Sequence, residues 1–157
     1  MTHETDSHGT GSCPYRIRPC DRRAARRRGE TEGHPGGDQV QRELVLRLRS
    51  IARDDDVVGR GGGEEFVIIA PRTTIEGRRR ACRACTPFVA ERSFSIGDHD
   101  IAVTVSAGCA SGIGESPASL VRRADQALYE SKLHGRNRVT CSSPHDVIGH
   151  VSPQMIQ

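Results

Sequence analysis

The feature that most constrains this chain is the run GRGGGEEFVIIAP at residues 59–71. Two short apolar segments flank the glycines, DVVG at 56–59 and FVIIA at 66–70. Two strands joined through consecutive glycines predict a β-hairpin, because glycine adopts the positive φ that tight hairpin turns require. We expect this hairpin turn to lie at the edge of a sheet.

Two carboxylates, Glu64 and Glu65, follow the glycines directly. In an extended segment adjacent side chains point to opposite faces, so at least one faces whatever rests on the glycines. Carboxylates beside bare backbone N–H groups suit a magnesium ion that bridges to phosphate oxygens. A solvent-exposed hairpin tip with two surface charges fits the same residues. Local composition leaves both interpretations open.

The pattern on either side of this run predicts alternating helices and strands. A first helix has apolar residues at helical spacing, with Asp38 as its N-cap. Pro71 is expected to end the second hairpin strand. A second helix is expected over 74–90, and a half-buried strand over 100–108. A third helix follows Ser116 and ends at Gly135, and a short strand over 138–140 comes after it. The apolar residues of the first helix are Val40, Leu44, Leu48 and Ile51.

The two ends of the chain lack such patterning. Residues 1–32 are rich in Arg and poor in aliphatic residues, so we expect them to be disordered or poorly packed. The tail from 141 to 157 shows no clear pattern. The chain of 157 residues, with 34% hydrophobic residues, is enough for one domain with a modest core.

Charge and targeting signals exclude several classes of protein. The net charge of +3 does not indicate a nucleic-acid partner. The sequence contains no run of 18 apolar residues, so it predicts no membrane span. The N-terminus lacks the apolar core of a signal peptide. A cytoplasmic location with reduced cysteines is expected. Cys82 and Cys85 form a C-x-x-C without a second pair at zinc-ribbon spacing, which favours buried or incidental thiols.

Five motifs in order resemble those of the GGDEF family, the diguanylate cyclases. RGGGEEF resembles the family signature in its GGEEF form. The other four are GHPGGDQVQREL at 33–44, RDDD at 53–56, VTVSAG at 103–108 and ADQALYESKLHGRNRV at 124–139. The resemblance covers about residues 33 to 140. It implies an α/β (α+β) fold with a nucleotidyl-cyclase-like central sheet, mainly antiparallel and flanked by helices.

The resemblance also implies a reaction and a set of site residues. Such proteins condense two GTP molecules into cyclic di-GMP and release pyrophosphate, and a homodimer brings two GTP-loaded domains face to face. Two Mg²⁺ ions per active site are expected. Glu64 and Glu65 would hold the metal and act in catalysis. The first and last residues of RDDD, which form the family's RxxD motif, would bind cyclic di-GMP as an inhibitor. The GTP-binding residues implied are Asp38, Gly62, Gly63, Lys132 and Arg136, and the inhibitory pair is Arg53 and Asp56.

The chain departs from the family pattern before its first helix. The family has an apolar strand there, with a metal-binding aspartate at its end and a guanine-reading Asn beyond it. Counting back from GHPGGD places Asp21 at the metal position and Gly29 at the Asn position. We therefore expect the first strand to be lost or degenerate, residues 33–140 to form a truncated domain, and cyclase activity to be weak or lost. A catalytically inactive module that binds cyclic di-GMP or GTP as a sensor is the alternative.

Overall fold

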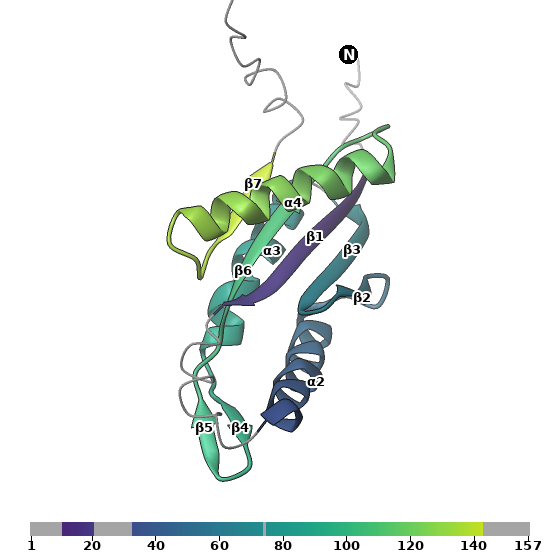
Figure 1. The fold of residues 1–157 in the computed structure, drawn as a ribbon. Coiled ribbons are helices and arrows are strands. Elements are labelled where there is room, and N and C mark those ends of the chain that lie inside the picture. Colours follow the sequence, from purple (N-terminus) through teal and green to yellow (C-terminus); the bar gives the residue numbers. More distant parts are fainter. Residues whose placement is uncertain (1–10, 21–32, 74, 143–157) are drawn as a thin grey trace, which may run out of the picture.

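The computed structural model describes residues 11–20, 33–73 and 75–142. A five-stranded sheet in the order β2-β3-β1-β6-β7 forms its centre, and β4 and β5 form a separate hairpin. All pairings are antiparallel except that of β6 with β7. The predicted class, a mainly antiparallel sheet flanked by helices, is confirmed (Figure 1). The elements are β1 (Gly11–Cys20), α2 (Gly33–Ile51), β2 (Val57–Gly62), β3 (Glu65–Thr73), α3 (Ile75–Ala90), β4 (Phe94–Ile96), β5 (His99–Ile101), β6 (Thr104–Ala110), α4 (Pro117–Leu133) and β7 (Val139–Ser142).

The central strand, β1, is present, so of the expectation that the first strand is lost or degenerate, the loss is wrong. It lies between β3 and β6, and its Ile17 pairs with Phe66 on one side and with Ala107 on the other. Ile17 is fully buried. Pro14, Pro19 and the interspersed arginines hid this strand from pattern analysis, because proline and charge are depleted in central strands. Pairing on both sides overrides that weak local preference, so the expectation of disorder is wrong for residues 11–20.

The helices cover the two faces of the sheet separately. α4 packs on β1, β6 and β7, whereas α3 lies on the opposite face, with α2 packed beside it (Figure 1). The main core lies on the α2–α3 side and includes Leu44, Leu48 and Phe66, each at most 1% exposed. The helical spacing predicted for the first helix is thus confirmed, because its apolar stripe faces this core.

Three predicted element boundaries are wrong. α2 begins at Gly33, so Asp38 lies inside the helix and is not its N-cap. Pro35 falls in the first helical turn, where a missing N–H costs little. β3 continues two residues beyond Pro71 to Thr73. The single strand expected at 100–108 is divided between β5 and β6. By contrast, Ser116 caps α4 as predicted and accepts a hydrogen bond from the Ser119 N–H.

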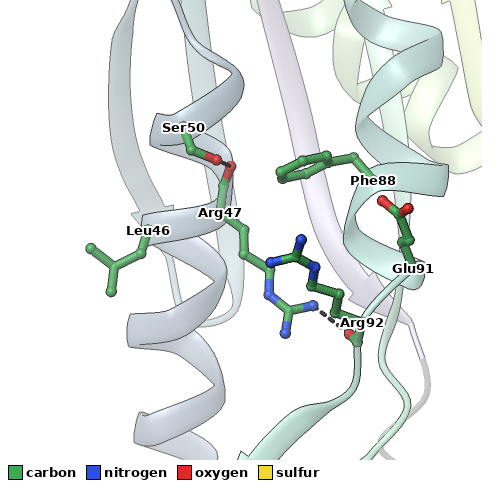
Figure 2. A pocket seen from close by; sticks show the side chains of 6 residues that line it. All are labelled: Leu46, Arg47, Ser50, Phe88, Glu91 and Arg92. Atoms are coloured by element: carbon green, nitrogen blue, oxygen red, sulfur yellow. Dashed lines mark hydrogen bonds between the residues drawn. The ribbon is translucent and has the colours of Figure 1, made fainter.

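One arginine joins α2 to the far end of α3. The Arg47 guanidinium lies over the Phe94 ring, 3.7 Å from its centroid, and donates to the Val89 carbonyl at 3.0 Å. It also donates to the carbonyl of Arg92, as Figure 2 shows. The pocket in that view, lined by Leu46, Arg47, Ser50, Phe88, Glu91 and Arg92, contains none of the predicted site residues. We therefore interpret this pocket as a packing feature of the α2–α3 contact.

Candidate active site

The hairpin turn between β2 and β3 forms as the sequence predicts. Gly62 pairs with Glu65, so Gly63 and Glu64 make the turn between the two strands. Gly62 has φ +128° and Gly63 has φ +51°, values that glycine adopts without strain. A Cβ added at either glycine would meet no atom within 4 Å. Because β2 is the edge strand, this turn presents open backbone at one edge of the sheet.

Arg60 holds the turn in shape, a role that the sequence analysis missed. Its guanidinium donates from Nε at 2.9 Å and from Nη2 at 2.6 Å to the Gly63 carbonyl. The side chain comes from β2, and the carbonyl it binds lies three residues later. In the sequence, the presence of Arg60 directly before the glycines of RGGGEEF could have indicated this role. Two donors from one rigid fork fix the carbonyl, which limits the freedom of the glycine run.

The two glutamates at the turn are half-buried. Glu65 opens β3 next to Phe66, which is 1% exposed and anchors the strand in the core. Glu64 and Glu65 each interact with another group of the chain. Oxygen ligands of this kind, beside glycines that leave room for a ligand, fit the needs of a hard divalent cation such as Mg²⁺. Glu65 is thus held at the start of β3, and Glu64 precedes it in the turn.

The end of β1 lies at the same end of the sheet as this turn. β1 and β3 are antiparallel, and their last pair toward the turn is Ile17 with Phe66. The next residues of each strand in that direction are 18–20 of β1 and Glu65 of β3. Asp21, which the family resemblance places at the metal position, follows β1 directly in the sequence but lies outside the described residues. Gly29 also lies outside them.

Three further predicted substrate-binding residues are on other elements. Asp38 is exposed on α2, and Lys132 is half-buried in the last turn of α4. Arg136 lies beyond the end of α4 with φ +59°, so Lys132 and Arg136, although four residues apart, do not lie on one helix face. Gly135, with φ +105°, ends the helix as predicted, and the Arg136 N–H donates to the Ser131 carbonyl at 3.0 Å.

The RxxD residues form a closed turn between α2 and β2. The Asp56 N–H donates to the Arg53 carbonyl at 3.0 Å, and the Arg53 N–H donates to Asp56 Oδ2 at 2.9 Å. The Arg53 side chain is 58% exposed and donates to Thr73 Oγ1 at 3.0 Å. The other carboxylate oxygen, Asp56 Oδ1, is buried without a hydrogen-bond partner. The structure therefore brings Arg53 and Asp56 together in one turn.

Comparison with known proteins identifies the class to which this fold and site belong. The family model "Diguanylate cyclase, GGDEF domain" matches residues 27–138. The chain belongs to the GGDEF domain family. Within the described residues, no helix combines the length and the apolar character that a bilayer crossing requires.

Individual relatives share the domain and extend beyond it. Diguanylate cyclase A of Treponema denticola is 40% identical over 115 residues, which cover 72% of this chain and 31% of that protein. Response regulator PleD of Caulobacter vibrioides is 40% identical over 114 residues, which cover 70% of this chain and 25% of that protein. The chain therefore spans about a third or less of the length of these two relatives.

Solved structures have the same fold. The GGDEF domain of DgcB from Caulobacter crescentus, in complex with c-di-GMP, has a TM-score of 0.73 and 34% identity, covering 86% of this chain and 81% of that one. The active GGEEF domain of a diguanylate cyclase from Vibrio cholerae has a TM-score of 0.70 and 29% identity, covering 83% and 81%. This similarity confirms the nucleotidyl-cyclase-like architecture.

Proposed function

We propose that this chain is a diguanylate cyclase domain that joins two GTP molecules into cyclic di-GMP with release of two pyrophosphates. The observation that carries the proposal is the β2–β3 turn. There, two glycines with positive φ lie beside two half-buried glutamates at an open sheet edge. The glycines carry no side chains, so a nucleotide can approach their backbone closely. The two glutamates that follow would hold the metal that neutralises phosphate charge.

Each residue of the turn has a distinct part in this proposal. Gly62 and Gly63 lie under the nucleotide, and Arg60 keeps the Gly63 carbonyl in place. Glu64 stands near the attacking 3′-hydroxyl, and Glu65 supports the metal from the start of β3. These two carboxylates would hold Mg²⁺, which when bound would supply positive charge against the phosphates. Asp21 becomes a stronger candidate ligand, because the strand that it follows is present.

Residues outside the turn bind the rest of the substrate. Asp38, exposed on α2, accepts hydrogen bonds from the guanine edge, since a carboxylate pairs well with adjacent N–H donors. Lys132 and Arg136 contact the terminal phosphates from the end of α4 and the turn after it. Gly29 has no side chain to replace the guanine-reading Asn. We therefore expect weak turnover, because loose positioning can cost on the order of 100-fold in phosphoryl transfer.

The test is turnover of GTP by the purified chain with Mg²⁺, with cyclic di-GMP measured by chromatography. Glu64→Ala is expected to lower the rate by about 100-fold or more, since it removes a metal ligand. Asp98→Ala is the matched control. Asp98 is an exposed carboxylate in the β4–β5 turn, on another hairpin. A Glu64→Ala rate equal to that of wild type and Asp98→Ala contradicts the proposal.

The turn formed by Arg53 and Asp56 supports a second candidate function, in which the chain binds cyclic di-GMP as a sensor. The exposed Arg53 fork can pair with a guanine edge or a phosphate. A guanine N–H donor would also satisfy Asp56 Oδ1, which is buried and unpaired. A buried acceptor in this state costs about 1–3 kcal/mol, so satisfying it favours the complex.

Titration calorimetry with cyclic di-GMP tests this second function. Arg53→Ala is expected to weaken binding by roughly 10- to 100-fold, the equivalent of one charged hydrogen bond. Arg49→Ala is the control, because Arg49 is an exposed arginine one helical turn earlier, in the last turn of α2. Both variants lower the net charge by one. Equal affinities in the two variants, or no heat in wild type, would rule out the sensor.

A further inference from the structure

Three cysteines far apart in the sequence meet inside the protein. The sulfur atoms of Cys82, Cys109 and Cys141 all lie within 4.8 Å of one another. Cys82 and Cys109 are buried, and Cys141 is half-buried. None of the three is in a disulfide. Together they offer three sulfur ligands to one point, an arrangement that the spacing of the cysteines in the sequence does not suggest.

The topology explains why these three side chains share one face of the sheet. A Cβ on Gly108 would lie 2.1 Å from the Ala124 carbonyl oxygen, so this position of β6 faces α4. Side chains alternate along a strand, and Cys109 therefore faces the opposite side, toward α3. Cys141 is its register partner on β7 and shares that face. Cys82 reaches the same place from α3, which covers this face of the sheet.

The spacing of the three sulfurs is close to what a metal ion requires. A zinc–sulfur bond of about 2.3 Å in tetrahedral geometry places two sulfurs about 3.8 Å apart. The observed upper limit of 4.8 Å needs a contraction of about an ångström or less to reach that value. Rotations of about 20–30° about χ1, which stay within one rotamer well, move cysteine sulfurs by distances of this size without moving the backbone.

We propose that Cys82, Cys109 and Cys141 bind one thiophilic metal ion, zinc(II) or copper(I), at the β6–β7 side of the sheet. Thiolates are the ligands that both ions prefer. Binding converts three thiols to thiolates and releases three protons, so affinity rises with pH. No electron is transferred. The site lies at the opposite edge of the sheet from the β2–β3 turn, and it is therefore separate from the proposed cyclase site.

The position of Cys141 gives the ion a path from solvent. β7 is the edge strand, and its residues are half-buried. A zinc ion with three protein ligands keeps a fourth position for water, which the partly open side of Cys141 can admit. The bound ion would cross-link α3, β6 and β7. We therefore expect metal binding to stabilise this part of the fold.

The chain contains a matched control for this site. Cys85 is also buried on α3, three residues after Cys82, but it is not one of the three clustered cysteines. Its thiol donates to the Ala81 carbonyl at 3.4 Å. Burial raises the pKa of the Cys85 thiol to about 11, and its position outside the cluster is what separates it from the three proposed ligands. The C-x-x-C spacing of Cys82 and Cys85 therefore does not define the ligand set.

Competition against a chromophoric chelator tests the proposal with the reduced full chain. One arm uses zinc(II) in air, and the other uses copper(I) without oxygen. We expect one ion per chain in at least one arm, with affinity lowered at least about 100-fold by Cys82→Ala or Cys141→Ala. Cys85→Ala should bind as wild type does. Cadmium–thiolate absorption in the ultraviolet counts the sulfur ligands independently.

Two results would overturn the inference. One is the absence of stoichiometric binding in both arms. The other is binding that survives Cys82→Ala and Cys141→Ala, which assigns the metal to other residues. Circular dichroism of each variant shows whether it is folded. Cys141→Ala, on the half-buried edge strand, keeps the test valid if the buried Cys82→Ala does not fold.

Discussion

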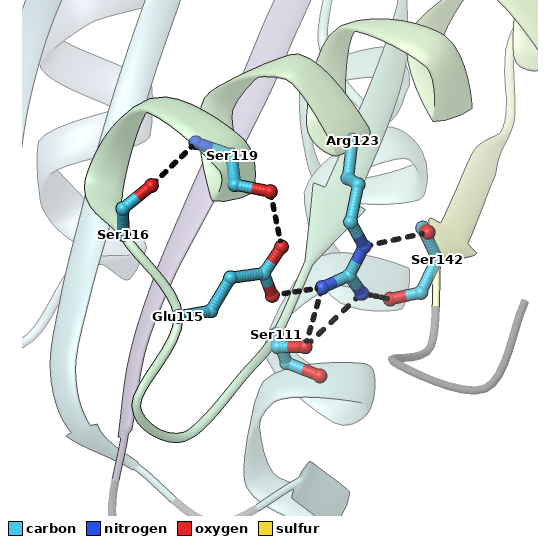
Figure 3. A network of polar contacts seen from close by, with 6 residues as sticks. All are labelled: Ser111, Glu115, Ser116, Ser119, Arg123 and Ser142. Atoms are coloured by element: carbon cyan, nitrogen blue, oxygen red, sulfur yellow. Dashed lines mark hydrogen bonds and ion pairs between the residues drawn. The ribbon is translucent and has the colours of Figure 1, made fainter. Parts of the chain in front are cut away.

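At the residue scale, one buried arginine connects α4 to the ends of β6 and β7. Arg123 is 7% exposed, forms an ion pair with Glu115, and donates to the carbonyls of Ser111 and Ser142 (Figure 3). Glu115 is its carboxylate partner in the loop before α4. A buried guanidinium without that partner keeps its desolvation cost but loses its counter-charge.

We predict that Glu115→Ala lowers the free energy of unfolding by about 3 kcal/mol. This is the low end of the cost of breaking a buried pair, because the two carbonyls still accept from Arg123. Urea denaturation measures the change. Glu115→Gln keeps the shape and one acceptor and should cost less. If Glu115→Ala unfolds at the same urea concentration as wild type, the network does not stabilise the fold.

At the element scale, the close contact between β6 and α4 depends on one glycine. A Cβ at Gly108 would lie 2.1 Å from both the Ala124 oxygen and the Leu128 nitrogen, which are backbone atoms. We predict that Gly108→Ala costs about 3 kcal/mol or more of stability, because the helix must move away from the sheet. Gly59→Ala is the control, since its Cβ meets nothing within 4 Å. Thermal melts in which the two variants lose the same number of degrees in melting temperature would contradict this prediction.

At the scale of the whole molecule, the proposed reaction needs two chains. One chain has one β2–β3 turn within its described residues, and that turn holds one GTP in the proposal. The catalytically active species is then a pair of domains. Its concentration varies as the square of the chain concentration when association is weak. We predict that tenfold dilution lowers the initial rate of cyclic di-GMP formation by about 100-fold. A rate per chain that stays constant on dilution, in a protein that size-exclusion chromatography shows to be monomeric at those concentrations, would contradict the need for a homodimer.

Local signals in the sequence determined most of the elements and the hairpin site. Consecutive glycines between two apolar segments specify a turn through backbone freedom alone, and Ser116 and Gly135 mark the ends of α4 through local hydrogen bonds. The RxxD turn also closes on itself through atoms three residues apart. Such features need no distant partner, so they could be predicted before the fold was known.

Only the tertiary structure decided what depends on distant contacts. β1 has weak local preference for a strand, and its place between β3 and β6 comes from pairing on both sides. The three-cysteine cluster joins residues 82, 109 and 141, whose proximity is created by sheet register and by the packing of α3. Such contacts leave no periodic pattern in the sequence. They join residues that are far apart in the chain, and they form only when the chain folds.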